Sequence, residues 1–295
     1  MYNGFSILIP TWNNLPYLKL CVDSIRRHSH YKHQIIVHVN EGSDGTREWL
    51  EQEGIEYTFS PQNIGVSLAM NTMRRMVKTD YIYFINDDMY VLPEWDIELM
   101  KEIDSLPNND FYLSGTMIQP HDNTDVGLCI NYGDSIETFQ EGRLLKEYKD
   151  IPYDDWQGAT RPPSLVHRNI WDLVGGYSIE FSPGMYSDPD FTAKLLAVGI
   201  RYMKGIGNSR VYHFETKTTG RIKKNEGSTQ FLLKWGFSNS TMRKYVTRQG
   251  ESWDKRNAPL NTTAIQKKQR FVKWKALWYL LRKGFGNILL DINKI

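Results

Sequence analysis

The chain has 295 residues, enough for one large α/β domain with appendages or for two small domains, and enough to bury a sizeable core. Hydrophobic residues make up 40% of it, and 36 Lys and Arg nearly balance 34 Asp and Glu. This composition is typical of a folded globular protein and excludes both a disordered chain and a dedicated nucleic-acid binder.

Cysteine usage and apolar runs bear on location. Cys21 and Cys129 are too few for a disulfide framework and lack metal-ligand spacing. The strand-like run from Phe5 leaves no room for a signal peptide, and no apolar run reaches the roughly 18 residues that span a bilayer. We therefore expect a cytoplasmic protein.

Short β-branched runs alternate with helical patterns in the first half of the chain. Strands are predicted at residues 5–10, 34–39, 56–60, 81–86 and 111–118. Helices are predicted at residues 15–29, 46–53, 65–78 and from Pro93 to about 106. This alternation indicates an α/β fold with a mostly parallel central sheet flanked by helices.

The second half is less regular. Residues 123–155 break into turn residues and charges, which predicts a loop or hairpin insertion. Regular patterns then predict a helix near 168–174, a turn at Gly175-Gly176, a helix from Pro189 to about 198, and strands at 200–206 and 209–214. After about residue 227 the chain is basic and aromatic, with helical patterns alone. We therefore predict a domain of residues 1–226, with halves of about 1–120 and 121–226, and a helical C-terminal extension of residues 227–295.

Asn86, Asp87 and Asp88 follow the strand predicted at residues 81–86. Open α/β sheets bind ligands at the carboxyl ends of their strands, so polar groups delivered there are placed for chemistry. Two carboxylates suit Mg²⁺ or Mn²⁺, which keep positions for water and for a substrate diphosphate. The alternative is a polar turn before the helix near Pro93.

Three more polar segments follow earlier predicted strands: Pro10-Thr11-Trp12-Asn13-Asn14, Asn40-Glu41-Gly42-Ser43-Asp44 and Asn63-Ile64-Gly65. With the Asn-Asp-Asp turn, this ordered set resembles the family 2 glycosyltransferases of GT-A fold, over roughly residues 5–220. The resemblance implies a Rossmann-like GT-A domain that transfers a sugar, with inversion, from a nucleotide-sugar donor.

The resemblance also implies roles for individual residues. It places in the nucleotide-sugar site Pro10, Thr11, Asn13, Asn40, Glu41, Asp44, Asn63, Gly65, Asn86 and Asp87. Asp88 is expected to contact the divalent metal, Mn²⁺ or Mg²⁺, because Asn86 replaces the usual first carboxylate. Asn40-Glu41 replaces the paired acids often found after the second strand, so UDP-, GDP- and dTDP-sugars all stay open as donors.

Inverting transfer needs a carboxylate that takes the proton of the acceptor hydroxyl. Residues 184–191 resemble the E-D-x-D segment of the family, with the base at Asp188 and Ser187 in place of the usual glutamate. The structural alternative is that Asp188 caps a helix whose first residue is Pro189. Asp190 is expected to support the site or to face solvent.

Five further residues are candidates by position. His213 would complete the metal shell or serve structurally at a strand end. Lys217 and Arg221 would close over the diphosphate or belong to a solvated loop. Trp156 and Arg161 fall where the family places acceptor-facing residues, with core packing as the alternative for Trp156.

The C-terminal sequence predicts an amphipathic helix between Lys267 and Phe285. One stripe holds Phe271, Trp274, Trp278, Leu281 and Phe285, and basic residues flank it. Such a helix lies peripherally on an anionic membrane, which would suit a lipid-linked acceptor, or packs on the domain or on a second copy in a homo-oligomer.

Two other functions are weighed against glycosyl transfer to a glycan, glycolipid or protein. A nucleotidyltransferase would normally carry a Gly-rich loop with Lys or Arg after the first strand, where this chain has TWNNLPYL. A catalytically silent nucleotide- or sugar-binding module would lack an available carboxylate near Asp188.

Overall fold

The computed structural model describes residues 2–121, 126–183, 185–216, 226–260 and 262–283. Lys217 and Arg221, the predicted diphosphate contacts, lie outside the described residues, as does Phe285 of the C-terminal stripe.

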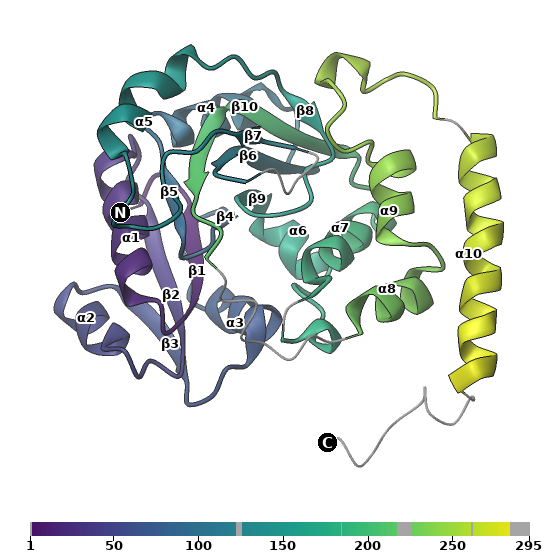
Figure 1. Ribbon diagram of the computed structural model, residues 1–295, viewed down its shortest axis with the longest axis horizontal. Coiled ribbons are helices and arrows are strands. Elements are labelled where there is room, and N and C mark those ends of the chain that lie inside the picture. The colour runs from purple at the N-terminus through teal and green to yellow at the C-terminus, as the bar shows by residue number, and fades with distance from the viewer. Residues whose placement is uncertain (1, 122–125, 184, 217–225, 261, 284–295) are drawn as a thin grey trace.

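A mixed sheet of ten strands, built from described residues, runs through the molecule in the order β3-β2-β1-β4-β9-β6-β10-β5 (Figure 1). Its first half is parallel and consists of β1 (Ser6–Trp12), β2 (Gln34–Asn40), β3 (Glu56–Ser60) and β4 (Tyr81–Phe84). These strands match the sequence prediction to within two residues at each end. Every carboxyl end in this half therefore lies at one edge of the sheet.

The other half of the sheet is not purely parallel. It contains β9 (Ser164–His167), β6 (Phe111–Gln119), β10 (Tyr202–His213) and β5 (Met89–Val91). β6 and β10 are parallel, whereas β9 and β5 pair antiparallel to their neighbours. Two short strands, β7 (Leu128–Cys129) and β8 (Trp156–Gln157), pair with β6 and β10.

Helices cover both faces of the sheet. One face packs against α1 (Leu15–His28), α2 (Thr46–Gln52) and α4 (Trp95–Ser105). The other packs against α3 (Gly65–Arg74), α6 (Arg168–Leu173) and α7 (Ser187–Ala197). With both faces covered, the central strands read as nearly continuous apolar runs.

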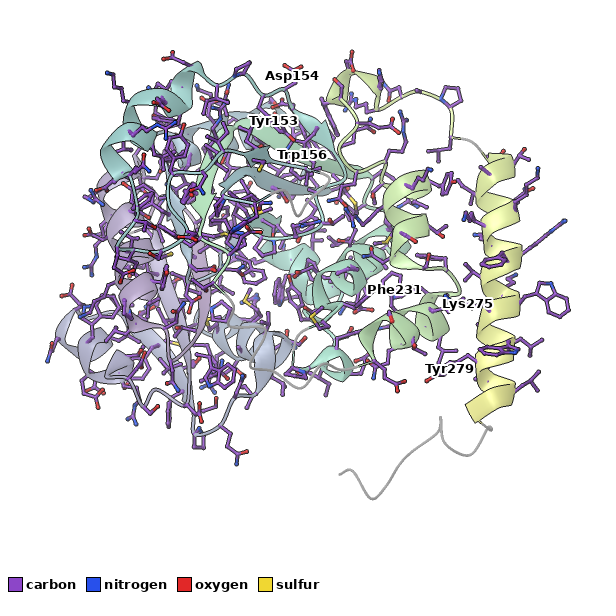
Figure 2. All side chains as sticks on the ribbon, in the orientation of Figure 1. Tyr153, Asp154, Trp156, Phe231, Lys275 and Tyr279 are labelled. Carbon is purple, nitrogen blue, oxygen red and sulfur yellow. The ribbon has the colours of Figure 1, made fainter. Side chains whose placement is uncertain are left out.

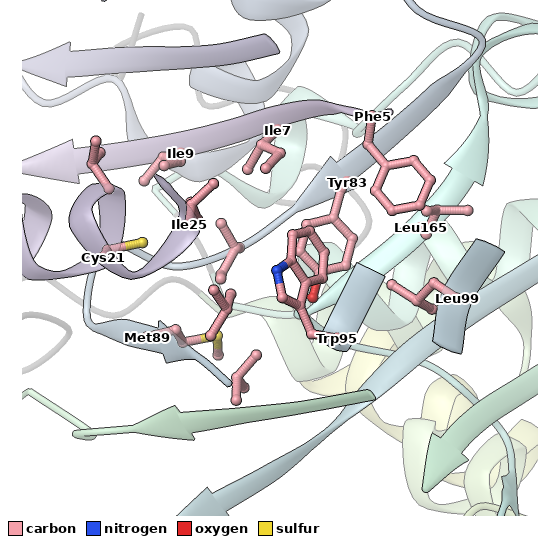
Figure 3. Close-up of a cluster of buried hydrophobic side chains, with 14 of the residues drawn as sticks. Phe5, Ile7, Ile9, Cys21, Ile25, Tyr83, Met89, Trp95, Leu99 and Leu165 are labelled. Atoms are coloured by element: carbon pink, nitrogen blue, oxygen red, sulfur yellow. The ribbon is translucent and has the colours of Figure 1, made fainter. Parts of the chain in front are cut away.

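The core explains how β1 is fixed between these layers. Ile7 and Ile9 point into the cluster beneath α1 and α4, and Leu8 points into the opposite cluster. Figure 3 shows the first cluster, where the ring of Trp95 lies 4.7 Å from that of Tyr83. Each such side chain contributes about 1.5–3 kcal/mol by burial, which makes β1 and the segment after it a rigid support.

The insertion predicted between residues 123 and 155 differs from a plain loop or hairpin. Its described part contains β7, the helix α5 (Glu141–Glu147) and a 3₁₀ turn (Tyr148–Asp150). Leu144 and Tyr148 pack into a third apolar cluster, and the buried Arg210 donates hydrogen bonds to the carbonyls of Tyr148 and Ile151. This segment is stabilised by packing against residues of β10, which are distant in the sequence. The local sequence pattern therefore does not predict the helix.

Two strand predictions are also corrected. Residues 200–206 and 209–214 form a single strand, β10, with an irregularity in its pairing between Ile206 and Arg210. β9 was not predicted, because it has only four residues. Its central position comes from pairing with β4 and β6.

The C-terminal region is helical, as predicted. It comprises α8 (Gly227–Trp235), α9 (Asn239–Thr241), a π turn (Met242–Val246), a 3₁₀ turn (Trp253–Lys255) and α10 (Thr262–Lys283). Phe231 of α8 packs against Phe181 and against Ala193 of α7. Among the described helices, none combines the length and apolar character needed to cross a bilayer.

Candidate active site

The carboxyl ends of β1 and β4 join the first two polar segments. The two strands are parallel neighbours, so Thr11 and Asp87 meet at the same sheet edge. The Thr11 hydroxyl donates a hydrogen bond to the Asp87 carboxylate, with 2.6 Å between the oxygens, and both residues are buried. Thr11 thereby helps to offset the cost of burying this charge.

Asn40 connects β1, β2 and the segment before α3. Its amide nitrogen donates to the carbonyl of Thr11 (3.2 Å), and its amide oxygen accepts from the backbone N–H of Ile64 (2.9 Å). Asn63 in turn accepts from the N–H of Gly65 (2.8 Å). The structure therefore brings together three of the predicted nucleotide-site segments.

Glu41 and Asn13, which directly follow β2 and β1, form a polar pair at the surface. The Asn13 amide donates to the Glu41 carboxylate (3.1 Å), and the indole of Trp12 donates to the same oxygen. Asn13 also accepts from the N–H of Ser43 (3.0 Å). Asn13 (φ 46°) and Glu41 (φ 64°) both adopt the left-handed region, which is uncommon outside glycine and recurs at functional sites.

Asp44 has a structural role that its sequence position did not indicate. One carboxylate oxygen accepts from the N–H of Leu15, where α1 begins (2.8 Å). The other accepts from the N–H and hydroxyl of Thr46, where α2 begins (3.2 and 2.6 Å). Both oxygens thus serve helix starts, which leaves Asp44 less suited than Glu41 to a bound ribose.

Gly65 makes the third segment a close neighbour of the loop before α7. A Cβ on Gly65 would lie 2.5 Å from the Cα of Pro183, and its φ of 76° favours glycine. The N–H of the next residue, Val66, donates to the carbonyl of Pro183 (3.3 Å). The nucleotide half and the segment that carries Asp188 are therefore in direct contact.

Asp88 and His213 come together because β10 ends beside β5. The register pairs His213 with Met89, which places the His213 Nε2 3.4 Å from a carboxylate oxygen of the buried Asp88. The other carboxylate oxygen accepts from the N–H and hydroxyl of Thr216, both at 2.8 Å. Asn86 precedes this pair, with its backbone carbonyl facing Cys21.

The electrostatics of this pair favour the ionised carboxylate. Burial alone would raise the pKa of Asp88, but the charge and hydrogen bond of His213 and the hydrogen bonds from Thr216 hold it below its ordinary value. Burial would lower the pKa of His213, and the neighbouring Asp88 carboxylate raises it instead.

The pair has the chemistry of a partial metal site. No group of three or more His, Cys, Asp or Glu side chains able to hold a metal gathers within the described ranges. The buried Nδ1 of His213 nevertheless has no hydrogen-bond partner there. Mg²⁺ and Mn²⁺ are often held by one or two protein ligands together with water and substrate phosphates, and Asp88 and His213 fit that arrangement.

Asp188 lies in the first turn of α7. The helix begins at Ser187 and its N-cap residue is Tyr186, so the alternative in which Asp188 itself caps the helix is wrong. The hydroxyl of Tyr177 donates to the Asp188 carboxylate (2.9 Å). Burial raises the pKa of Asp188 from 3.8 to about 6, although this hydrogen bond and the charge of Arg161 oppose the rise. A pKa near the working pH is what a general base needs.

The charge of Arg161 acts both on Asp188 and on the pair of Asp88 and His213. It lowers the pKa of Asp188 and that of His213, so the guanidinium lies within electrostatic range of both. Trp156, the other predicted acceptor contact, is buried; its ring covers Gly205 and its indole N–H donates to Thr116 (3.0 Å). Figure 2 labels Trp156 beside Tyr153 and Asp154, among the strands. The structure places Trp156 in core packing and leaves Arg161 at the site.

The residues that hold Asp190, two positions after Asp188, were not predicted from the sequence. Asp190 is fully buried, and its carboxylate accepts from the indole of Trp235 (2.8 Å) and lies 2.9 Å from the ammonium of Lys234. Of the two alternatives for Asp190, the one in which it faces solvent is wrong. Its two partners belong to α8, so the C-terminal region anchors the helix that carries Asp188, and only the tertiary packing reveals this.

Comparison with known proteins identifies the family. A sequence profile described as "Glycosyl transferase family 2" matches residues 6–166, more than half of the chain. A relative, "Glycosyltransferase GlyA" from Streptococcus pneumoniae, is 29% identical over 103 residues, which cover 33% of this chain and 15% of that protein. The chain thus spans only a small part of this curated relative.

Solved structures share the fold at low sequence identity. S. aureus TarS residues 1 to 349, in complex with UDP-GlcNAc, is similar over 99% of this chain and 77% of that chain, with a TM-score of 0.56 and 12% identity. GalNAc-T7 with UDP, GalNAc and Mn²⁺ is similar over 82% of this chain and 48% of that chain, with a TM-score of 0.54 and 13% identity.

The fold is that of the GT-A class: a central sheet whose carboxyl edge gathers polar segments, with a buried carboxylate just after β4. The chain belongs to glycosyl transferase family 2.

Proposed function

We propose that the protein is an inverting glycosyltransferase that moves one sugar from a nucleoside-diphosphate sugar to a hydroxyl group of a glycan, glycolipid or protein. The observation that carries the proposal is the carboxylate of Asp188, whose pKa is raised to about 6. The charge of Arg161 acts on Asp188 and also on His213. His213 in turn is paired with Asp88.

The proposed reaction follows from these positions. Asp188 accepts the proton of the acceptor hydroxyl as its oxygen bonds to the anomeric carbon, and the bond from that carbon to the diphosphate breaks. We assign to Arg161, in place of the predicted acceptor contact, stabilisation of the departing diphosphate by its positive charge. A divalent ion held by Asp88 and His213 would supply further positive charge to the same group. Tyr177 orients the Asp188 carboxylate through its hydrogen bond.

The donor is proposed to lie against the carboxyl ends of β1, β2 and β4. Glu41 and Asn13 offer exposed polar groups for the base and ribose, and Asp87, held by Thr11, lies nearer the metal pair. The TarS and GalNAc-T7 structures contain UDP or a UDP-sugar, and the latter contains Mn²⁺, which supports a UDP-sugar and Mn²⁺ as the first candidates. Lys217 and Arg221 remain predicted diphosphate contacts, and a cytoplasmic location remains part of the proposal.

Thermal unfolding in the presence of nucleotides tests the donor site. UDP, GDP, CDP and dTDP are compared with and without Mn²⁺, for the native protein and for Asp88→Asn. A ligand at 100 times its Kd stabilises the folded state by about 2.7 kcal/mol, so a rise of several degrees in Tm is expected for one nucleotide with Mn²⁺. The rise should be smaller in the variant, and no rise with any nucleotide would contradict the proposal.

A further inference from the structure

The helix α10 contacts the rest of the protein along one side. Val272 is buried there, and the hydroxyl of Tyr279 donates to the carboxylate of Glu226, just before α8 (2.6 Å). Figure 2 shows Lys275 and Tyr279 on the side of α10 that faces α8. This contact fixes which side of the helix points away from the protein.

The outward side carries an apolar stripe. Its members are Phe271, Trp274, Leu277, Trp278 and Leu281, which are 65%, 72%, 43%, 58% and 66% exposed. At about 100° per residue they cover about 120° of the helix surface, opposite Val272 and Tyr279. They are five of the twelve large hydrophobic side chains exposed among the described residues, so this single helix concentrates them. An exposed patch of this kind indicates an interaction surface.

The charge of α10 has one sign. Between Thr262 and Lys283 the sequence has seven Lys and Arg and no Asp or Glu. At helical spacing, Lys267 and Arg270 lie one turn before Phe271 and Trp274 on the outward side. Neither of these two cations forms an ion pair with a carboxylate in the described part of the chain.

More cations lie on the flank of the helix. A hollow of about 630 Å³ between α8, α9 and α10 is lined in part by Arg243, Lys244, Lys268 and Lys275, and Phe271 of the stripe also lines it. Positive charge therefore lies on the outward side, at Lys267 and Arg270, and also on the flank of α10 next to the hollow.

We propose that the outward side of α10, defined by the stripe and its cations, docks on an anionic lipid surface. The Trp, Phe and Leu side chains enter the boundary between headgroups and acyl chains, and the Lys and Arg side chains meet the lipid phosphates. A second copy fits the surface poorly, because two facing stripes would bring their cations together. The proposal goes beyond sugar transfer and can fail independently of it, because lipid binding needs no catalysis.

Vesicle co-sedimentation tests the proposal with the full chain. The native protein should sediment with vesicles of phosphatidylglycerol and phosphatidylcholine, and should stay in solution with phosphatidylcholine alone. The double variant Trp274→Ser, Trp278→Ser should lose at least ~10-fold in partition, because it removes the two largest apolar groups. The matched control is Leu173→Ser, Ile179→Ser, which removes two residues of similar exposure (65% and 59%) away from α10 and should bind like the native protein.

The charge is tested separately. Lys267→Glu with Arg270→Glu should weaken partition by at least ~10-fold, as should a rise in salt concentration. All of these side chains are on the surface, so each variant should keep the native Tm within about 2 °C, which separates lost docking from lost folding. Failure of the native protein to bind anionic vesicles would overturn the proposal. So would a dimer in light scattering that the double Trp variant abolishes, because a second copy would then cover the stripe.

Discussion

Replacing Asp188 with Asn should remove activity and at the same time stabilise the fold. Asn keeps the shape and still accepts the hydrogen bond from Tyr177, but it cannot take a proton from an acceptor. Loss of a general base costs typically 10²–10⁴-fold in rate. The stabilisation follows from burial, which raises the pKa of Asp188 from 3.8 to about 6.

The size of the effect follows from linkage. At about 1.4 kcal/mol per pKa unit, the gap between 3.8 and about 6 makes the ionised carboxylate cost the folded state ~3 kcal/mol at neutral pH. Asn avoids this cost but loses the attraction of a negative charge to the N-terminus of α7, worth up to about 1 kcal/mol. The variant should therefore be about 2 kcal/mol more stable at pH 7.5, a rise of roughly 5 °C in Tm.

The sign of the pH dependence is fixed by the raised pKa. The stability contributed by the protonated carboxyl is fully present below 3.8 and is lost as the pH rises through about 6. The advantage of the Asn variant should therefore shrink by about 2 kcal/mol between pH 7.5 and pH 4.5.

Urea unfolding at the two pH values, together with an assay of nucleoside diphosphate release, measures both effects. Asp104→Asn is the control, because it removes a carboxylate from an exposed position on α4 and should change stability by less than about 0.5 kcal/mol. Full activity of the Asp188 variant, or a stability change that does not depend on pH, would refute the reasoning.

Three further predictions concern the metal pair, the close approach of two segments, and the anchor behind the base. Asp88→Asn should weaken the binding of UDP in the presence of Mn²⁺ at least ~10-fold in titration calorimetry, because it removes a negatively charged ligand of the ion. An unchanged affinity would contradict the role of Asp88 as a metal ligand. Gly65→Ala should cost about 2–4 kcal/mol in urea unfolding, because its Cβ would meet the backbone of the next loop, whereas Gly54→Ala, with similar φ and nothing within 4 Å, should cost about 1 kcal/mol; equal losses would contradict the contact. Trp235→Phe should cost about 1–3 kcal/mol by leaving the buried Asp190 carboxylate with one donor fewer, and an unchanged free energy of unfolding would show that this hydrogen bond does not matter.

The parallel half of the sheet could be predicted because its signals are local. The runs that became β1 and β2 are largely apolar, that of β3 is rich in β-branched and aromatic residues, and polar residues follow all three. The family resemblance placed Thr11 and Asp87 in one site, and the structure joins them by a hydrogen bond.

What could not be predicted depends on partners that are distant in the sequence. Tyr177 and Arg161 approach Asp188 from separate segments, and Trp235 reaches Asp190 from α8. Asp44 has a sequence position that suits a ligand-binding residue, but backbone N–H groups at two helix starts occupy its oxygens. In each case the role of the side chain depends on contacts that form only after the helices have packed on the sheet.

The stereochemistry of donor turnover tests the central claim most directly. Proton NMR of the protein with a UDP-sugar and Mn²⁺ identifies the anomer formed first, with the added acceptor or with water in its place. We predict release of UDP and a product of inverted anomeric configuration, in a reaction that Asp188→Asn slows by at least ~100-fold. A product of retained configuration, or release of pyrophosphate in place of a nucleoside diphosphate, would contradict the account.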